Sequence, residues 1–565
     1  MAGRLIRLFH TLRYLRFEQL FFQVYYRIAR PLLLHWCRWR VAPAVERRPW
    51  ESAWDGLRYA QPGHRENATF TYLGEVGSLV RPADWNNGSQ SRLWFYHLHY
   101  LDDLGAQGAA SKAADCQQLI ARWIAENPPL AGTGWEPYPL SLRLVNLVKW
   151  CSENSNFPEV WVSSLAQQAQ ALSMQLERHI LANHYFANGK ALVFVGAFLS
   201  GKMADRWLKR GLRILDQEIA EQFLPDGGHC ELTPMYHATL LWDVCELVKL
   251  ADRSGHAALL ARRQSWVGAI QRGLKWLSAM THPDGEVAFF NDAAKGHAPR
   301  AAQLNAYAKL LGIETEQPAP KAACHHLAST GYVACEWAGG QTKLIVDVAA
   351  VGLDYQPGHA HADTLSFELS IRGKRVFVNG GTSTYEANAE RLRQRGTAAH
   401  NTLVLDGVDS SEVWSGFRVA RRARVCDVAV ENAVAERYRI AASHDGYSRL
   451  SGKSVHRRDW CLTPGRLEIH DQVTAYTDHQ AIIYFHVEPT WQAVLRDGAT
   501  VDLVDNVSGQ PVCRVESLGG AELRVTPFRW CPRFGEQVKA HSIELHFPVG
   551  EGDLSHTTRI TWKNP

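Results

Sequence analysis

The sequence has 565 residues but no pair of cysteines in C-x-x-C spacing, although 11 cysteines are scattered from Cys37 to Cys531. An odd number of widely spaced cysteines in a long chain is typical of reduced, buried thiols and argues against a disulfide framework. Runs of about eighteen apolar residues are also absent, so the sequence predicts no transmembrane helix. A net charge of only +4 is too balanced to indicate nucleic acid as a partner.

The first 50 residues lack lysine and hold two acidic residues, Glu18 and Glu46, against ten arginines. Arginines interrupt the apolar residues between Leu5 and Phe21, which argues against a cleaved signal peptide and favours a cytoplasmic or inner-membrane-associated location over a periplasmic one. The pattern is that of a basic amphipathic helix. Two interpretations stay open: peripheral contact with an anionic membrane surface, or docking on the rest of the protein.

The chain is longer than one hydrophobic core usually supports, so we expect at least two domains. From about residue 90 to 315 the apolar residues recur with helical spacing between short breaks that contain Gly, Pro or Asn. After Gln317-Pro318-Ala319-Pro320 they alternate as in strands. We therefore predict an Arg-rich helical extension over residues 1–85, a helical domain over 86–320 and an antiparallel β-sandwich over 321–565.

The predicted helices have similar lengths and short connections, which indicates antiparallel helix pairs. They cover residues 114–126, 163–180, 190–199, 206–223, 233–250, 257–280 and 301–311. The clearest predicted strands cover residues 331–337, 342–348, 364–371, 375–379, 402–405, 466–470, 481–487 and 543–547. No helix is expected among these strands, and Arg372-Gly373-Lys374 is expected to form a tight hairpin turn.

Two histidines, His359 and His361, follow a Pro-Gly turn at the start of a predicted strand. Side chains two residues apart on a strand share one face, so we expect both to project together from the rim of a sheet. One can hold a metal while the other faces a substrate. In isolation, a His-x-His pattern is more often a pair of surface imidazoles at a turn.

Two further polar segments lie at predicted helix ends. Asn183 and His184 fall at a break between helices, where both can grip a carboxylate; alternatively, Asn183 caps a helix and His184 packs in the core. Tyr236 lies in the first turn of a helix that Thr233 and Pro234 open. Its hydroxyl can donate or accept a proton there, or its ring can pack on a neighbouring helix.

A zinc site is a further prediction. His361 and His400, with an oxygen ligand between them in sequence, would make a three-ligand site with one open position.

Together these segments resemble the heparinase II/III family of polysaccharide lyases and its relatives among alginate lyases. The resemblance is carried by NHYFANGKAL at 183, DGGHCELTPMYH at 226, FND at 290, GHAHADTLSFEL at 358, FVNGGTSTY at 377 and RGTAAHNTLVLDG at 395, with LWFYHLHYLDDL at 93 and WEPYPLSLRLVNLVKW at 135 upstream. It implies an incomplete (α/α) toroid followed by an antiparallel β-sandwich, with a cleft between them. It also implies β-elimination on an anionic polysaccharide that contains uronic acid.

The resemblance also implies roles for individual residues. Asn183 and His184 would neutralise the uronate carboxylate. Tyr236 would donate a proton to the leaving glycosidic oxygen or also act as the base, and His359 would be the second proton-transfer or substrate-binding group. The neighbouring motif residues that we expect to contact the substrate are Glu231, His237, Arg393 and Arg395.

By the same resemblance, His361, Asn379 and His400 would hold a structural zinc. The chain departs from the family here, because relatives often have an aspartate where it has Asn379. A neutral amide oxygen is a weaker ligand, so hydrogen bonds between the two histidines and Asn379 are the alternative.

Two other functions stay open. An inverting glycoside hydrolase would need two carboxyl groups facing across a cleft, for which Glu136, Glu231 and Asp292 are the candidates. A non-catalytic protein that binds or assembles polysaccharide, beside an exopolysaccharide synthesis or export system, is favoured by the Arg-rich start. The sequence leaves the polysaccharide, endo or exo action, and the oligomeric state undetermined.

Overall fold

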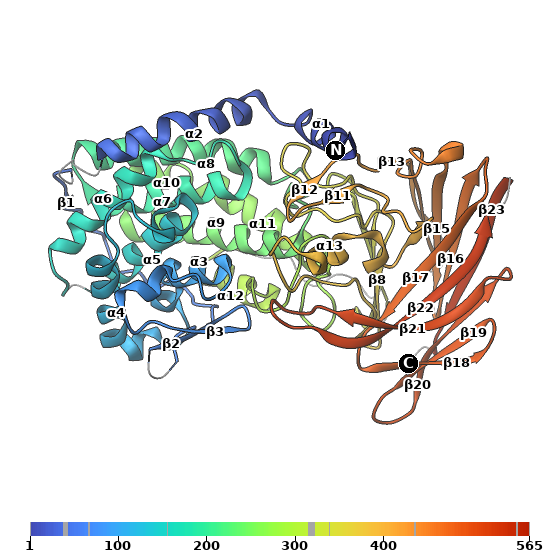
Figure 1. The fold of residues 1–565 in the computed structure, drawn as a ribbon. Helices are drawn as coiled ribbons and strands as arrows, with labels where there is room; N and C mark the ends of the chain where they lie inside the picture. Colours follow the sequence, from blue (N-terminus) through green and yellow to red (C-terminus); the bar gives the residue numbers. More distant parts are fainter. Residues whose placement is uncertain are drawn as a thin grey trace.

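The computed structural model describes residues 2–37, 43–65, 68–154, 156–314, 323–337, 339–433, 437–549 and 552–563. Helices form one half of the molecule and antiparallel sheets the other, and the two halves lie side by side (Figure 1). The predicted fold class, a helical region followed by antiparallel sheets, is confirmed. The predicted boundary between residues 320 and 321 lies outside the described residues. No helix among the described residues is long and apolar enough to cross a membrane.

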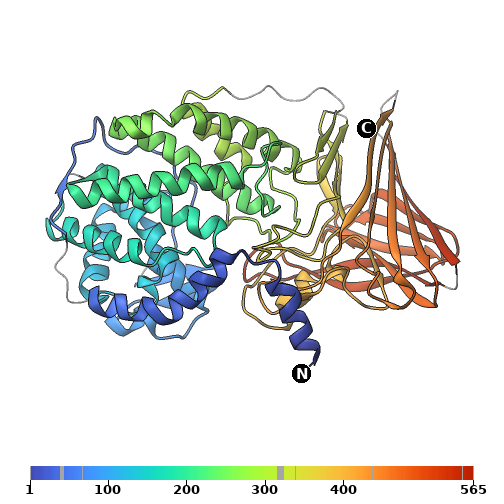
Figure 2. The same cartoon turned by 90° about the horizontal axis from the view of Figure 1, so that it is seen from above.

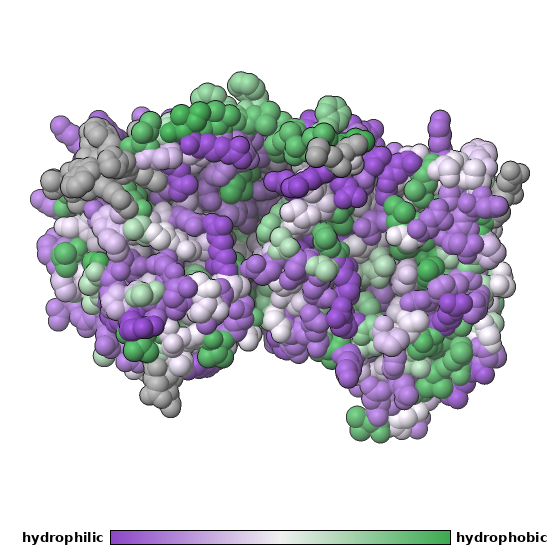
Figure 3. Space-filling view, in the orientation of Figure 1, coloured by the Kyte–Doolittle hydropathy of each residue, from purple (hydrophilic) through white to green (hydrophobic). Residues whose placement is uncertain are grey.

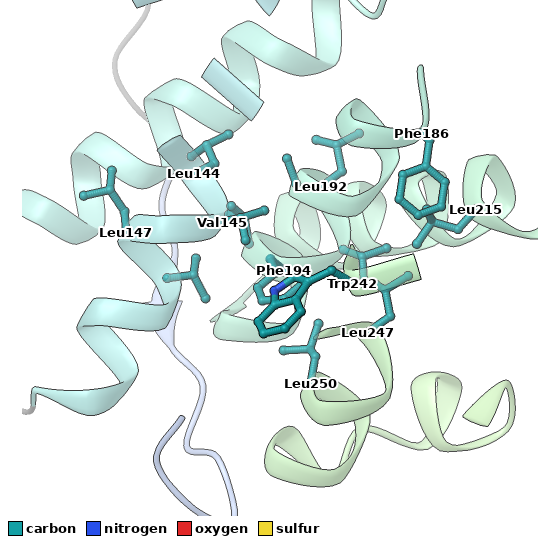
Figure 4. Packing of buried hydrophobic residues seen from close by; sticks show 14 of the residues in the cluster. Leu144, Val145, Leu147, Phe186, Leu192, Phe194, Leu215, Trp242, Leu247 and Leu250 are labelled. Atoms are coloured by element: carbon teal, nitrogen blue, oxygen red, sulfur yellow. The ribbon is translucent and has the colours of Figure 1, made fainter. Parts of the chain in front are cut away.

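The helical half is built from antiparallel neighbours that share one apolar core. Its helices are α3 (Arg92–Tyr100), α4 (Ala113–Glu126), α5 (Pro137–Glu153), α6 (Val160–Met174), α7 (Ala182–Phe198), α8 (Lys202–Gln222), α9 (Pro234–Ser254), α10 (Ala257–Leu260), α11 (Arg263–Ala279) and α12 (Ala301–Leu310). Figure 4 shows Leu144 of α5, Phe194 of α7 and Leu250 of α9 in this core, and all three are fully buried. Burial of each such side chain stabilises the fold by about 2 kcal/mol.

The close approach of α7 and α8 depends on glycine. A Cβ atom at Gly211 would lie 2.6 Å from the carbonyl oxygen of Gly189, so the two helices meet backbone to backbone. This packing leaves α7 buried on nearly every side.

Helix boundaries differ from the prediction in three places. Helix α7 begins at Ala182, eight residues before the predicted residue 190, so Asn183 and His184 lie in its first turn and not at a break. Because α7 is buried all round, it has no polar face and gives no helical period in the sequence. Helix α6 ends at Met174 instead of residue 180, and the predicted helix 257–280 is split into α10 and α11.

Within the described residues the sheet half contains two large antiparallel sheets. A nine-stranded sheet has the order β21-β22-β17-β9-β8-β7-β6-β5, with β10 also paired to β17, and an eight-stranded sheet has the order β13-β14-β15-β16-β23-β20-β19-β18. The first comprises β5 (Ala323–Leu327), β6 (Tyr332–Trp337), β7 (Thr342–Asp347), β8 (Phe367–Ile371), β9 (Lys374–Phe377), β10 (Leu403–Leu405), β17 (His479–Val487), β21 (Glu522–Trp530) and β22 (Val538–Val549). The second comprises β13 (Val425–Ala433), β14 (Arg437–His444), β15 (Val455–Thr463), β16 (Arg466–Ala475), β18 (Trp491–Asp497), β19 (Thr500–Asp505), β20 (Pro511–Leu518) and β23 (Gly552–Thr561).

A second apolar core lies between these sheets. Every other residue of β16 is buried, and Leu467 and Ile469 of β16 belong to the same buried cluster as Ile483 and Phe485 of β17. The alternation fixes the register, because a slip of one residue would turn the apolar side chains outward. The predicted β8–β9 hairpin is confirmed, with positive φ at Arg372 and Gly373 in its turn.

Two segments of the sheet half, and the N-terminal extension, differ from the prediction. Strand β8 begins at Phe367, three residues later than predicted, so His359 and His361 lie in a loop and not on a strand. A short helix, α13 (Ala389–Arg395), lies between β9 and β10, where no helix was expected. The extension 1–85 is not helical throughout: after α1 (Ala2–Leu12) and α2 (Phe17–Cys37) it contains a hairpin of β2 (Thr69–Tyr72) and β3 (Glu75–Ser78).

Helices α1 and α2 run along one side of both halves (Figure 2). Helix α2 lies over the helical half, and α1 reaches the hairpin of β11 (Val413–Trp414) and β12 (Arg418–Val419). Thr11 accepts a hydrogen bond from the Trp414 indole at 3.1 Å. The N-terminal segment therefore bridges the seam between the two halves.

Candidate active site

A buried carboxylate, Asp292, organises the seam between the two halves. Its side chain accepts hydrogen bonds from His359 Nδ1 at 2.9 Å and His361 Nε2 at 2.8 Å, and from the Thr382 hydroxyl at 3.1 Å. The guanidinium of Arg391, also fully buried, binds both carboxylate oxygens. Burial alone would raise the pKa of Asp292, but Arg391 and the two histidines hold it well below its usual range. Asp292 is therefore ionised and fixes the orientation of both imidazole rings.

The ring of His359 stacks on Tyr236, the residue that the first turn of α9 presents. Their ring centroids lie 4.0 Å apart. Thr233 caps α9 by accepting the Tyr236 backbone N–H at 3.0 Å, as the sequence predicts. The Tyr236 and Tyr385 hydroxyls are 3.0 Å apart. Since His359 donates its Nδ1 proton to Asp292, its Nε2 carries the free lone pair beside Tyr236.

The phenol of Tyr236 stays protonated at neutral pH. Burial raises its pKa well above the usual range, and the hydrogen bond with Tyr385 offsets only part of this effect. A neutral tyrosine with such a pKa is a proton donor and a poor base.

Glu231 is a neighbour of both His359 and His184. Its carboxylate is 3.7 Å from His359 Nε2, is almost fully buried, and has no hydrogen-bond partner within normal geometry among the described residues. Burial raises its pKa, and the neighbouring His359 and His184 offset only part of the effect. A buried carboxyl group whose hydrogen-bonding capacity is not filled by the protein is costly unless a ligand or a proton satisfies it.

Glu177 stabilises the cationic form of His184. Its Nδ1 donates to Glu177 at 2.9 Å, and Glu177 in turn accepts from the Asn188 amide at 3.0 Å. Although burial lowers the pKa of His184, the charge and hydrogen bond of Glu177 raise it to a net value above the ordinary one. The His184 ring lies 4.3 Å from that of Tyr138 and is only partly buried. Asn183 precedes it in the same helical turn.

Backbone strain collects beside these residues. Non-glycine residues with positive φ directly precede or follow three of them: Ala182 before Asn183, Leu232 after Glu231, and Asn291 before Asp292. Non-glycine residues rarely adopt this backbone conformation unless the surrounding contacts impose it, and such strain clusters at functional sites. Here the Asn291 amide donates to the Leu232 carbonyl at 2.9 Å and its oxygen accepts the His361 N–H at 2.9 Å, which ties the two halves together.

A row of aromatic rings leads from the site along the helical half. Tyr96 and Tyr100 of α3 are 6.3 Å apart, and Tyr100 lies 6.0 Å from Tyr138 of α5, which contacts His184. Tyr96 and Tyr138 are partly exposed and Tyr100 between them is buried, so the first two rings can lie against the apolar face of a sugar.

Three residues predicted to bind substrate have protein partners of their own in this structure, and their assignment stays a prediction. His237 is fully buried, donates to the Gly273 carbonyl and packs on Trp276 between α9 and α11. Arg395 is fully buried and donates to the Ala360 carbonyl. Arg393 pairs with Glu390 on the other side of α13.

The residues predicted to hold zinc fit a metal site only in part. His361 Nδ1 and His400 Nε2 are 3.3 Å apart, about the nitrogen separation in a zinc tetrahedron. The Asn379 oxygen instead accepts the Asn401 N–H at 3.1 Å. The described residues contain no group of three His, Cys, Asp or Glu side chains placed to hold a metal. This donor set does not fit a three-ligand zinc site, and zinc binding stays a prediction.

Sequence reasoning missed the roles of Arg391 and Tyr385, and assigned Asp292 to a hydrolase. The motifs that contain Asp292 and Tyr385 had been singled out, but nothing in the sequence indicated that both reach one histidine. Glu177 lies outside every motif, so only the fold brings it to His184.

The chain belongs to the heparinase II/III family. The family's model of the heparinase II/III N-terminus matches residues 42–316, and its heparinase II/III-like C-terminal model matches residues 319–563. The family indicated by the sequence motifs is therefore confirmed.

Relatives of this chain include two named heparin-sulfate lyases. That of Bacteroides stercoris is 25% identical over 251 residues, which are 41% of this chain and 37% of the relative. That of Bacteroides thetaiotaomicron is 24% identical over 332 residues, 51% and 47% of the two chains. The match thus spans less than half of either relative. The crystal structure of heparan sulfate lyase HepC from Pedobacter heparinus has a TM-score of 0.61 at 18% identity, covers 88% of this chain and 81% of that chain, and so shares the fold.

Proposed function

We propose that this chain is a polysaccharide lyase that cleaves a uronic-acid-containing polysaccharide by β-elimination. The observation that carries the proposal is the contact between His359 and Tyr236 at 4.0 Å, with Asp292 fixing the histidine from behind. His359 as the base and Tyr236 as the acid would then lie next to each other, where both can reach one sugar unit. Family membership and relatives named heparin-sulfate lyases support the same reaction class.

The reaction needs positive charge at the substrate carboxylate. The C5 proton of a uronate is a poor acid, because its removal places a second negative charge beside the carboxylate. In this proposal His184, whose cationic form Glu177 stabilises, and Asn183 in the same helical turn donate to this carboxylate and spread the charge. Each such donor lowers the barrier by about 3 kcal/mol.

Proton transfer follows from the two neighbouring rings. His359 Nε2 takes the C5 proton, the C–H electron pair forms the C4=C5 double bond, and the C4–O bond breaks. The leaving glycosidic oxygen takes the Tyr236 proton, and the Tyr385 hydroxyl stabilises the resulting phenolate. Glu231 is placed to bind a sugar hydroxyl beside His359. In this proposal His359 is the base and Tyr236 is the acid, and the raised pKa of Tyr236 supports that assignment.

The site favours a weakly sulfated or unsulfated polymer. Beside His184 the helical half offers the partly exposed rings of Tyr138 and Tyr96, while Arg92 is already paired with Glu136 and Arg391 with Asp292. Dense sulfate would call for several arginines that are free to form bidentate hydrogen bonds. We therefore infer a glycosaminoglycan-like or exopolysaccharide substrate with few sulfates.

An inverting hydrolase does not fit this geometry. Asp292 is saturated by Arg391 and the two histidines, and Glu136 by Arg92 and the Tyr96 hydroxyl. Neither carboxyl group is free to protonate a leaving group or to activate water, so only Glu231 remains of the three candidates.

A spectrophotometric screen tests the proposal. Anionic polysaccharides are incubated with the protein, and the near-ultraviolet absorbance of the C4=C5 double bond is followed. We expect product from a uronate polymer, with losses of about 10²-fold or more for Tyr236→Phe and His359→Ala. Tyr447→Phe is the matched control, since it removes one buried hydroxyl, which donates to the Leu403 carbonyl in the sheet half. Binding without absorbance, unaffected by Tyr236→Phe, would establish the non-catalytic alternative.

A further inference from the structure

Helices α1 and α2 pack on the protein with their apolar sides turned outward. The exposed fractions reach 65% at Phe9, 82% at Phe17 and 70% at Leu32. The outward face consists of Leu5, Ile6, Phe9 and Leu12 of α1 and Phe17, Leu20, Phe21, Val24, Ile28 and Leu32 of α2, all exposed. In α2 these residues recur at helical spacing, so they form one stripe. Figure 3 shows apolar residues along the edge that α1 and α2 follow.

The inward side of α2 and the turn before it make polar contacts with the rest of the protein. Gln19, which is almost fully buried, donates to the carbonyls of Tyr355 and Ile180. Arg16 forms an ion pair with Glu221 and lies over the Tyr355 ring at 3.6 Å. A helix that only covers its own protein would bury its apolar stripe and expose its charges. Here the apolar stripe faces outward instead, so it requires a partner outside the chain.

Unpaired positive charge flanks this outward face. Arg4, Arg13 and Arg27 are exposed and form no ion pair within the described part of the chain. The single acid of the two helices, Glu18, is already paired with Arg178. An apolar stripe flanked by free arginines is the pattern of helices that lie in the surface of an anionic bilayer.

We propose that α1 and α2 together form a docking face for an anionic lipid surface. The aromatic and aliphatic side chains enter the boundary between headgroups and acyl chains, and the arginines bind lipid phosphates. The face extends over both halves of the molecule, because α1 contacts the β11–β12 hairpin and α2 contacts the helical half. This proposal is independent of the proposed catalysis.

Vesicle flotation with the full-length protein tests the docking face. We expect binding to vesicles of phosphatidylglycerol and phosphatidylethanolamine, little binding to phosphatidylcholine, and loss of binding at high salt. The double variant Phe21→Ser/Ile28→Ser should lower partitioning by at least about tenfold. The triple variant Arg4→Gln/Arg13→Gln/Arg27→Gln should lower it by roughly fivefold per arginine. Val507→Ser, which removes another highly exposed apolar side chain in the sheet half, is the matched control.

Three outcomes would overturn the proposal. The first is no flotation with any lipid, for protein whose circular dichroism shows that it is folded. The second is equal binding to anionic and neutral vesicles that the arginine variant does not change. The third is a concentration-dependent dimer that Phe21→Ser/Ile28→Ser dissolves, because a second copy of the chain would then cover the stripe. None of these outcomes depends on lyase activity.

Discussion

Asp292 holds the candidate site together, because it binds both His359 and Arg391. It fixes the tautomer of His359 and neutralises the buried Arg391. We predict that Asp292→Asn lowers kcat by about 10²–10⁴-fold, because an amide no longer selects the Nδ1–H tautomer. We also predict a loss of about 3 kcal/mol in the free energy of unfolding, because the Arg391 charge is left buried and unpaired. Steady-state kinetics and urea unfolding measure the two effects.

His359→Gln serves as the control for this prediction, since it removes the base but leaves the Asp292–Arg391 pair intact. It should lose activity with a much smaller loss of stability. A fully active Asp292→Asn variant would contradict the role given to His359.

His184 should make substrate binding depend on pH. Its pKa is raised in the folded protein, so the cationic form persists above the ordinary value of about 6.5 and is lost as the pH rises through the folded pKa. We predict that KM rises through this transition. Glu177→Gln removes the partner that raises the pKa, so the rise in KM should move to lower pH, whereas Glu431→Gln at an exposed position should not move it. The pH profile of KM measures the shift, and an unchanged profile would contradict the assignment.

The zinc content of the purified protein tests whether Asn379 can serve as a metal ligand. The neutral Asn379 oxygen already accepts the Asn401 N–H, so we predict that wild-type protein loses zinc during dialysis against a mild chelator. Asn379→Asp, with a charged ligand beside His361 and His400, should retain more zinc. Retention of one full equivalent by wild-type protein would show that the three residues bind zinc as they stand.

The roles of individual residues could be predicted from the sequence only in part. Tyr236, His359 and His184 lie in recognisable motifs; Tyr236 contacts His359, and Glu231 is near both histidines. Arg393 and Arg395 lie on different sides of α13: Arg395 is fully buried, as is Arg391 four residues before it, whereas Arg393 pairs with Glu390. Sequence spacing alone gives this periodicity but not which side of a short helix faces inward.

At the scale of elements, the first turn of α9 positions the proposed acid. The Thr233 hydroxyl accepts the Tyr236 N–H, so the cap and the catalytic side chain share one turn. We predict that Thr233→Ala costs about 1 kcal/mol of stability and also lowers kcat. His256→Ala removes a comparable cap from α10, away from the site, and should cost stability without a change in kcat. Thermal unfolding and kinetics distinguish the two, and equal effects on kcat would contradict the positioning role.

Elements were predictable where they have one buried face. Strand β16 alternates regularly and α8 is strongly amphipathic, and the sequence located both. Helix α7 is buried all round, and the loop before β8 is held by Asn291 and Asp292 rather than by its own pattern. Burial on every side and contacts distant in sequence both remove the local period on which such predictions rest.

At the scale of the whole molecule, the order of helices and sheets followed from composition and motif order. The strand order did not, because β20 pairs with β23 and β10 with β17 across long sequence separations. The seam likewise depends on such contacts, since Asn291 joins the Leu232 carbonyl of one half to His361 of the other.

The most direct measurement of the central claim is mass spectrometry of the product formed in water enriched in heavy oxygen. β-Elimination breaks the C4–O bond without water. The account therefore predicts a product with an unsaturated end, which is lighter by one water than the corresponding hydrolysis product and carries no label. Tyr236→Phe should suppress this product. Incorporation of heavy oxygen at the new reducing end would show hydrolysis and would contradict the roles given to Tyr236 and His359.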